Sequence, residues 1–116
     1  MANAKIRIDF SKIESFRDFC RQLADQLGFD CGCYSRDAFH DRMRDINLGY
    51  HKNARLSQGE TLRIGVFGFR AFSKRNPALA RIVQEHLDRL NEEALTEGHG
   101  APLYEFVSLP FLQADF

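Results

Sequence analysis

The chain has 116 residues and carries 16 basic and 16 acidic side chains, so its formal net charge is zero. This length suits a single domain, expected to span residues 1–116, and neutrality argues against a general nucleic-acid binder, which usually has an excess of Lys and Arg. No apolar run approaches the roughly 20 residues of a membrane-spanning helix. The opening MANAKIRIDF lacks a secretory signal pattern, and three Cys cannot form a full disulfide framework. We therefore expect a cytoplasmic protein without membrane contact.

The first predicted elements are a strand over residues 5–10 and a helix over about 14–27. Apolar and charged residues alternate in KIRIDF, which is the period of a half-buried strand. The helix has two competing starts, Ser11 and Ser15, because an acidic residue follows each of them at capping-box spacing. Gly28 is expected to end the helix in the left-handed conformation. The apolar stripe of this helix consists of Phe16, Phe19, Cys20, Leu23 and Leu27.

A second, shorter helix is predicted over residues 35–46, with Ser35 as its N-cap. Asp37, Asp41 and Asp45 then stand at positions i, i+4 and i+8 and cluster on one side of the helix. Like charges at this spacing repel each other. The row therefore either meets a cation from outside the chain or is a solvated face balanced by arginines. The opposite side should pack through Phe39, Met43 and Ile46, and the row is flanked by His40 and Arg44.

The middle of the chain is predicted to contain a long loop and a central strand. Residues 47–61 show no regular period and carry polar residues and glycines, which indicates a loop. Residues 62–69, LRIGVFGF, have apolar residues at both odd and even positions, as in a parallel strand that is buried on both faces. Gly65 and Gly68 are placed within this strand. A short helical turn is expected within residues 69–75.

The last two predicted elements are a long helix over residues 77–96 and a strand over 102–109. Asn76 and Pro77 form a good helix start, because Asn caps the helix and Pro at the first position loses no hydrogen bond. Since strands alternate with helices, we expect an α/β fold with a three-stranded parallel sheet packed against three to four helices. The predicted core includes Phe16, Phe19, Leu23, Phe39, Met43, Ile64, Val66, Leu87, Leu90 and Phe106.

Charge is distributed unevenly along the chain. Residues 47–75 carry six basic side chains and one acidic side chain, whereas residues 76–116 carry two basic and seven acidic ones. The basic middle segment supports one alternative function, a regulator that binds RNA or another anionic partner.

Cysteine and histidine offer little catalytic chemistry. Cys31 and Cys33 are close in sequence, but no second Cys or His pair has the spacing of zinc ligands. We therefore expect reduced, metal-free thiols near the second helix, with Cys20 buried in the first helix. Cys33 and His40 could form a nucleophile and base, but no third residue that would orient them is visible. A small Cys/His enzyme is a further alternative, while the main expectation is a non-enzyme without a cofactor.

Four motifs occur in a recognisable order with compatible gaps. The opening IDFSKIESFRDF contains a strand, a polar turn and the start of a helix. DAFHD (37–41) stands where the barstar family has Asp-Ala-Leu-Trp-Asp, and FRAF (69–72) stands where it has Trp-Arg-Gln-Phe. EEALTEG (92–98) closes the long helix much as that family does. The whole chain therefore resembles the barstar family of intracellular ribonuclease inhibitors.

The resemblance implies three parallel strands packed against helices, and an immunity or antitoxin protein that plugs the active site of a toxin, in particular a ribonuclease or another nuclease. In the family, acidic side chains of the second helix and of the end of the last helix occupy the positions of substrate phosphates. The matching residues here are Asp37, Asp41 and Glu93. The sequence departs from the family at His40, which replaces the Trp of the motif, and at Cys31, which replaces a contact aromatic.

We expect a monomeric inhibitor that forms a 1:1 complex with this toxin. The expected partner-binding residues are Asp37, Asp41, Glu93, His40, Tyr34, Asp45 and Arg44.

Overall fold

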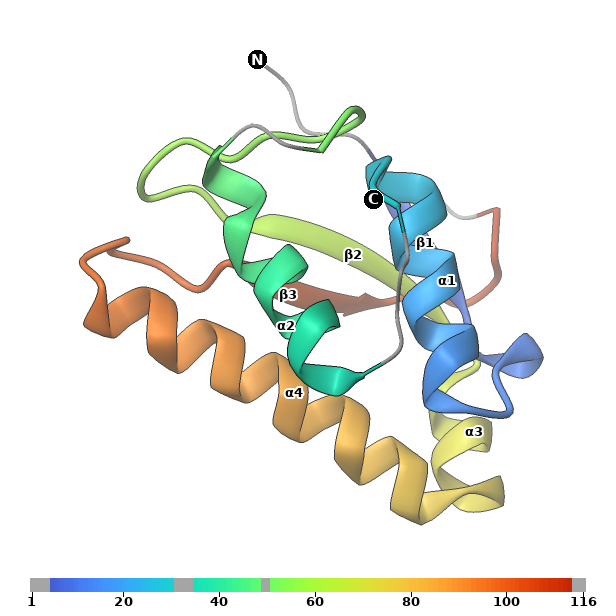
Figure 1. The fold of residues 1–116 in the computed structure, drawn as a ribbon. Coiled ribbons are helices and arrows are strands. Elements are labelled where there is room, and N and C mark those ends of the chain that lie inside the picture. Colours follow the sequence, from blue (N-terminus) through green and yellow to red (C-terminus); the bar gives the residue numbers. More distant parts are fainter. Residues whose placement is uncertain (1–4, 31–34, 49–50, 114–116) are drawn as a thin grey trace.

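The structure, a computed structural model, describes residues 5–30, 35–48 and 51–113 (Figure 1). Tyr34, Cys31 and Cys33 lie outside the described residues, so the predictions made for them stay open. The elements are β1 (Ile6–Asp9), the 3-10 helix η1 (Phe10–Lys12), α1 (Phe16–Leu27), α2 (Arg36–Arg44), the 3-10 helix η2 (Asp45–Leu48), β2 (Leu62–Phe67), α3 (Phe69–Arg75), α4 (Pro77–Thr96) and β3 (Tyr104–Ser108).

The three strands form one parallel sheet in the order β1-β2-β3. Ile6 pairs with Ile64 and Ile64 with Phe106, so apolar residues of neighbouring strands share one face of the sheet. The predicted α/β fold, a three-stranded parallel sheet with four helices, is confirmed. The prediction that β2 is buried on both faces is wrong in part, because Arg63 is exposed on the second face and pairs there with Glu105 at 3.6 Å.

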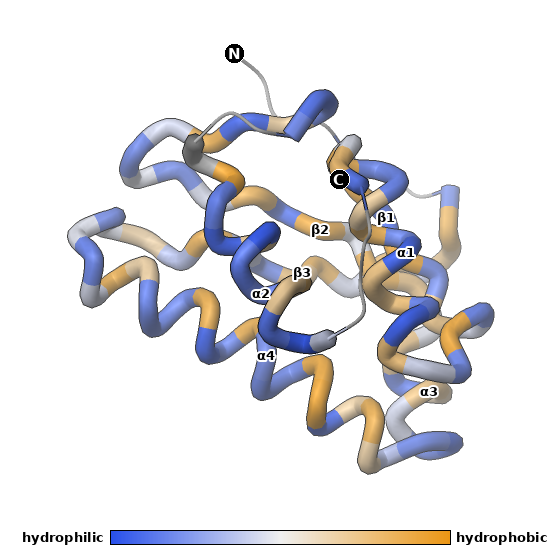
Figure 2. The backbone as a smooth tube through the Cα atoms, in the orientation of Figure 1, coloured by the Kyte–Doolittle hydropathy of each residue, from blue (hydrophilic) through white to orange (hydrophobic). Residues whose placement is uncertain are grey.

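The packed face of the sheet and the apolar sides of the helices form the core. Apolar residues are concentrated in the strands and recur along α1 and α4, whereas α2 is mostly hydrophilic (Figure 2). Of the predicted core, three members are only half-buried and pack against its margin: Phe16, Leu87 and Phe106. The other seven are buried: Phe19, Leu23, Phe39, Met43, Ile64, Val66 and Leu90.

Local interactions decide where the first helices begin and end. Of the two candidate starts of α1, the structure uses Ser15, whose Oγ accepts from Asp18 N at 3.2 Å, while Asp18 accepts from Glu14 N at 2.9 Å. Gly28 ends the helix with φ 83°, as predicted.

Gly68 was predicted to lie inside the second strand, and this is wrong. It adopts φ 75° between β2 and α3, where it precedes the first helical residue, so the strand ends at Phe67 and the expected helical turn is a helix of seven residues. A left-handed backbone costs a glycine little, which is why the chain can turn from strand to helix at this point.

Amide side chains pair with the outer edges of the sheet. The backbone N–H and C=O of Arg7 bond to Gln26, and those of Asp9 bond to Gln22, both from α1. At the other edge, Asn91 of α4 accepts from Tyr104 N at 3.0 Å and donates to Tyr104 O at 2.9 Å. These contacts fix α1 and α4 against the sheet.

A buried tyrosine ties the second helix to the third strand. The hydroxyl of Tyr104 donates to the backbone carbonyl of Met43 at 2.5 Å, and Tyr104 is only 1% exposed. Burial raises the pKa of this hydroxyl well above its usual value, so it stays a donor. The end of α2 is therefore held against the sheet, and its opposite face is free to point outward.

Candidate functional site

The aspartates of α2 lie on the face that points away from the core. The helix begins with Ser35, whose Oγ accepts from Ala38 N at 3.1 Å. Asp37 lies in the first turn, where the helix dipole favours an anion, and both Asp37 and Asp41 are exposed. The opposite side is buried, as predicted, through Phe39, Met43 and Ile46.

Arg44 balances the far end of the aspartate row. Its guanidinium lies 3.5 Å from Asp41 Oδ1 and 3.9 Å from Asp45 Oδ1. The side chains of Arg44 and Asp41 are 42% and 62% exposed, so water screens this pair and it contributes little to stability. Asp45 is half-buried at the C-terminal cap of α2, which separates it from the two exposed aspartates.

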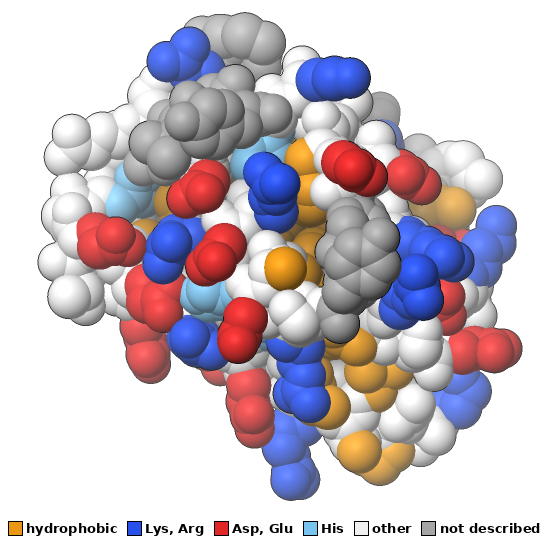
Figure 3. All heavy atoms as spheres, viewed as in Figure 1, with side chains coloured by type: hydrophobic (Ala, Val, Ile, Leu, Met, Phe, Trp, Pro, Cys, Tyr) orange, Lys and Arg blue, Asp and Glu red, His pale blue; other side chains and the backbone are white. Residues whose placement is uncertain are grey.

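Helix α4 brings Glu93 against α2. Glu93 Oε1 lies 2.6 Å from His40 Nε2, a contact between residues 53 positions apart, and Glu93 Oε2 lies 3.3 Å from Arg89 Nε. The hydrogen bond from His40, together with the nearby Arg89, holds the pKa of Glu93 below its usual value, so it is an anion at neutral pH. We call Asp37, Asp41, Asp45 and Glu93 the acidic surface. In Figure 3, acidic side chains interspersed with basic ones gather where α2 and the second half of α4 lie in Figure 1.

His40 does not lie on the exposed flank where the helical pattern put it. It is 3% exposed, because α4 packs against this side of α2 and covers the imidazole. His86 of α4 lies behind it, with the ring centroids 4.9 Å apart, and also contacts the rings of Phe16 and Phe39. Burial and the neighbouring His40 lower the pKa of His86 to about 4, so His86 is neutral at pH 7.

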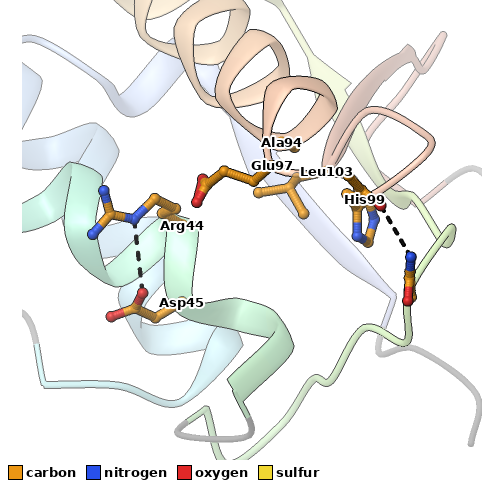
Figure 4. A pocket seen from close by; sticks show the side chains of 8 residues that line it. Arg44, Asp45, Ala94, Glu97, His99 and Leu103 are labelled. Atoms are coloured by element: carbon orange, nitrogen blue, oxygen red, sulfur yellow. Dashed lines mark hydrogen bonds and ion pairs between the residues drawn. The ribbon is translucent and has the colours of Figure 1, made fainter.

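Two hollows lie on either side of the contact between α2 and α4. The larger, of about 330 Å³, has Arg44 and Asp45 on one side, while Glu97, Leu103 and His99 line the other parts of its wall (Figure 4). The smaller, of about 270 Å³, lies near the start of α2 and is lined by residues that include Asp37, Glu85 and Arg89.

Some of the basic side chains of the middle segment make contacts within the fold. Arg75 is engaged by the fold, since its Nη2 donates to the backbone carbonyls of Phe10 and Ile13 at 3.1 and 3.2 Å. Arg63 pairs with Glu105 on the open face of the sheet. Two of the six basic side chains are thus engaged by the fold, while Lys52, Arg55, Arg70 and Lys74 are exposed, so the alternative of an RNA-binding regulator stays a prediction.

The thiol and metal predictions are tested only in part. Cys20 is buried in α1, as predicted, and burial raises the pKa of its thiol to about 12, so it is unreactive. Within residues 5–30, 35–48 and 51–113, no group of three or more His, Cys, Asp or Glu side chains could hold a metal ion.

No helix in the described part of the chain is both long and apolar enough to cross a bilayer.

Sequence reasoning did not identify His86, Arg89 or Glu97 as neighbours of the site. The i, i+4 spacing of Arg89 and Glu93 was a visible signal of their ion pair. The contact of His86 with His40 had no such signal, because it depends on how α2 and α4 pack.

Comparison with known proteins identifies a family for the chain. Residues 3–106 match the family described as barstar, the barnase inhibitor, which is most of the chain. No curated protein and no solved structure gives a significant match. The sequence motifs, the parallel three-stranded sheet with four helices and the family match agree, and the chain therefore belongs to the barstar family.

Proposed function

We propose that the chain is an immunity or antitoxin protein that inhibits a toxin ribonuclease by covering its basic active site with the acidic surface. The observation that carries this proposal is the pair Asp37 and Asp41, exposed one turn apart on a helix of a barstar-family fold, with Glu93 of α4 in contact with His40 of the same helix. The family consists of ribonuclease inhibitors and immunity-type proteins rather than enzymes.

The charges of the acidic surface suit an active site that binds RNA. A ribonuclease holds substrate phosphates with Lys, Arg and His side chains, and carboxylates presented at a similar spacing can take the place of those phosphates. Opposite charges also speed the encounter and fix the orientation of two proteins. The negative charge of Asp37 is further favoured by its place in the first turn of α2.

The rest of the proposal follows from this mode of action. Occlusion of an active site needs no cofactor and consumes one inhibitor per enzyme, so we propose a monomer that forms a 1:1 complex in the cytoplasm. Asp45 and Arg44 lie at the rim of the surface, beside the larger hollow, where they can contact the partner. His40 contributes in a different way, which is considered below.

The test is a titration of ribonuclease activity. Barnase and the nuclease encoded beside the gene for this chain are each mixed with increasing amounts of the purified chain, and the rate of RNA hydrolysis is recorded. We expect the activity of at least one of them to fall linearly and to end at one equivalent. The double variant Asp37→Ala/Asp41→Ala should lose this inhibition, whereas Asp25→Ala, which removes an exposed carboxylate of α1, should retain it. Full activity of both enzymes in the presence of excess inhibitor would reject the proposal.

A further inference from the structure

We infer that His40 is a positioning residue for Glu93, and that its buried imidazole holds the glutamate carboxylate in one orientation for the partner. This inference rests on the proposed function, because Glu93 has to be oriented only if a partner binds it. The position of His40 in the predicted helix had suggested that it touches the partner directly. The inference instead gives His40 an indirect role.

The geometry of the contact supports a role from behind the surface. The side chain of His40 is 4% exposed and that of Glu93 is 32% exposed, so the imidazole approaches the carboxylate from the interior. The distance of 2.6 Å between Nε2 and Oε1 is that of a strong hydrogen bond to a charged acceptor. His40 itself has almost no surface left with which to touch a partner.

The imidazole has one hydrogen-bonding partner among the residues described, and that partner is Glu93. His40 Nδ1 is buried and makes no hydrogen bond within this part of the structure. The ring also packs against that of His86 at an interplanar angle of 70°, and both residues lie in the contact between α2 and α4. A side chain held in this way can act as a rigid support.

Two donors together restrict Glu93. His40 holds Oε1 from the interior, and Arg89, whose side chain is 61% exposed, holds Oε2 from the surface. An unrestrained glutamate side chain would lose rotational freedom on binding, and this loss lowers affinity. A partner cation meets a carboxylate that is already oriented and has to compete only with the exposed Arg89.

The first test measures how four substitutions change the affinity for the nuclease that is inhibited, either barnase or the enzyme encoded beside the gene. Glu93→Gln and His40→Leu should each weaken binding about tenfold, and the double variant should be no weaker than either, because both remove the same oriented carboxylate. His40→Gln, which places an amide N–H near the position of Nε2, should restore binding to within about threefold of the parent. As a matched control, Glu97→Gln should combine additively with His40→Leu.

Two outcomes of this cycle would overturn the inference. Additive losses in the His40→Leu/Glu93→Gln double variant would show that His40 acts independently of Glu93. A His40→Gln variant as weak as His40→Leu would show that the hydrogen bond has no role in binding.

A second measurement needs no partner. The carboxyl carbon of Glu93 is titrated by NMR in the free protein, where its pKa should lie below the usual value. This pKa should rise toward the usual value in His40→Leu, because the hydrogen bond from His40 is the largest cause that lowers it. An unchanged Glu93 pKa in a folded His40→Leu variant would overturn the inference. If neither enzyme is inhibited, the proposed function fails, and the titration still decides whether His40 holds Glu93.

Discussion

The basic middle segment and the acidic surface contribute opposite charge to the chain, and they differ in how their charged side chains contact the rest of the fold. Arg75 lies over the ring of Phe72, with its guanidinium carbon 5.6 Å from the ring centroid, and donates to two backbone carbonyls. Asp37 has no ion pair among the described residues, and the pair formed by Asp41 is largely exposed. Arg75 therefore shows that a charge counted in the sequence can be used within the fold, whereas Asp37 remains available to a partner.

The largest expected effect is on the pH dependence of stability, and it comes from His86, which is kept neutral beneath the acidic surface. Its pKa falls from 6.5 to about 4 on folding, so the unfolded chain binds an additional proton between these values. The free energy of unfolding should therefore decrease as the pH is lowered from 6.5 toward 4, by at most about 3 kcal/mol. His86→Phe should remove this part of the pH dependence. Denaturant unfolding at several pH values measures it, and equal slopes in parent and variant would contradict the prediction.

The next prediction concerns whether Arg75 of the basic segment stabilises the fold. Arg75→Met removes two hydrogen bonds from a charged donor to carbonyls of the turn after β1, and should lower the free energy of unfolding by about 1–2 kcal/mol. Arg70→Met, on an exposed position of the same helix, should change it by less than about 0.5 kcal/mol. Chemical denaturation of both variants gives the comparison. An equal loss of unfolding free energy in both variants would mean that the positive charge of α3, and not the hydrogen bonds of Arg75, stabilises the fold.

The acidic surface should behave in the opposite way. Asp37→Ala and Asp41→Ala should each weaken binding to the inhibited ribonuclease by more than about 1 kcal/mol, because an exposed carboxylate that meets a cationic site is desolvated and paired there. The stability of the free protein should change by less than about 0.5 kcal/mol, since the relief of like-charge repulsion is offset, at Asp37, by the loss of its interaction with the helix dipole. Calorimetric titration and thermal unfolding on the same samples measure both quantities. Arg55→Ala, an exposed residue of the basic segment, is the matched control.

The smallest effect is expected for the ion pair on the open face of the sheet. Arg63 and Glu105 are both 58% exposed and 3.6 Å apart. A double-mutant cycle of Arg63→Ala and Glu105→Ala should give a coupling free energy below about 0.5 kcal/mol. A larger value would show that the basic segment stabilises the fold through surface pairs as well as through Arg75.

The fold was largely predictable because each helix carries local signals. Ser35, Asn76 and Gly28 act at the helix ends as the sequence indicated, and the apolar periods placed seven of the ten predicted core residues in the interior. Gly68 was misplaced because a glycine within an apolar run is compatible both with a strand and with a left-handed turn.

The site was less predictable, because it depends on contacts between helices. The spacing of Asp37 and Asp41 gave their exposed side correctly. The burial of His40 could not be read from α2 alone, since it is produced by α4, which lies more than 30 residues further along the chain. The helical period of α2 shows which residues share a side, but it does not show that α4 covers the side that carries His40.

The amide side chains at the margins of the sheet restrict how this protein can associate. Strand β1 already has its outward N–H and C=O groups paired with Gln22 and Gln26, and Asn91 occupies those of Tyr104. Open strand edges are the usual starting points of domain swapping and amyloid growth. An incoming strand would first have to displace a glutamine or asparagine that imitates a peptide group. The outer edge of β1 is therefore blocked against the addition of another strand.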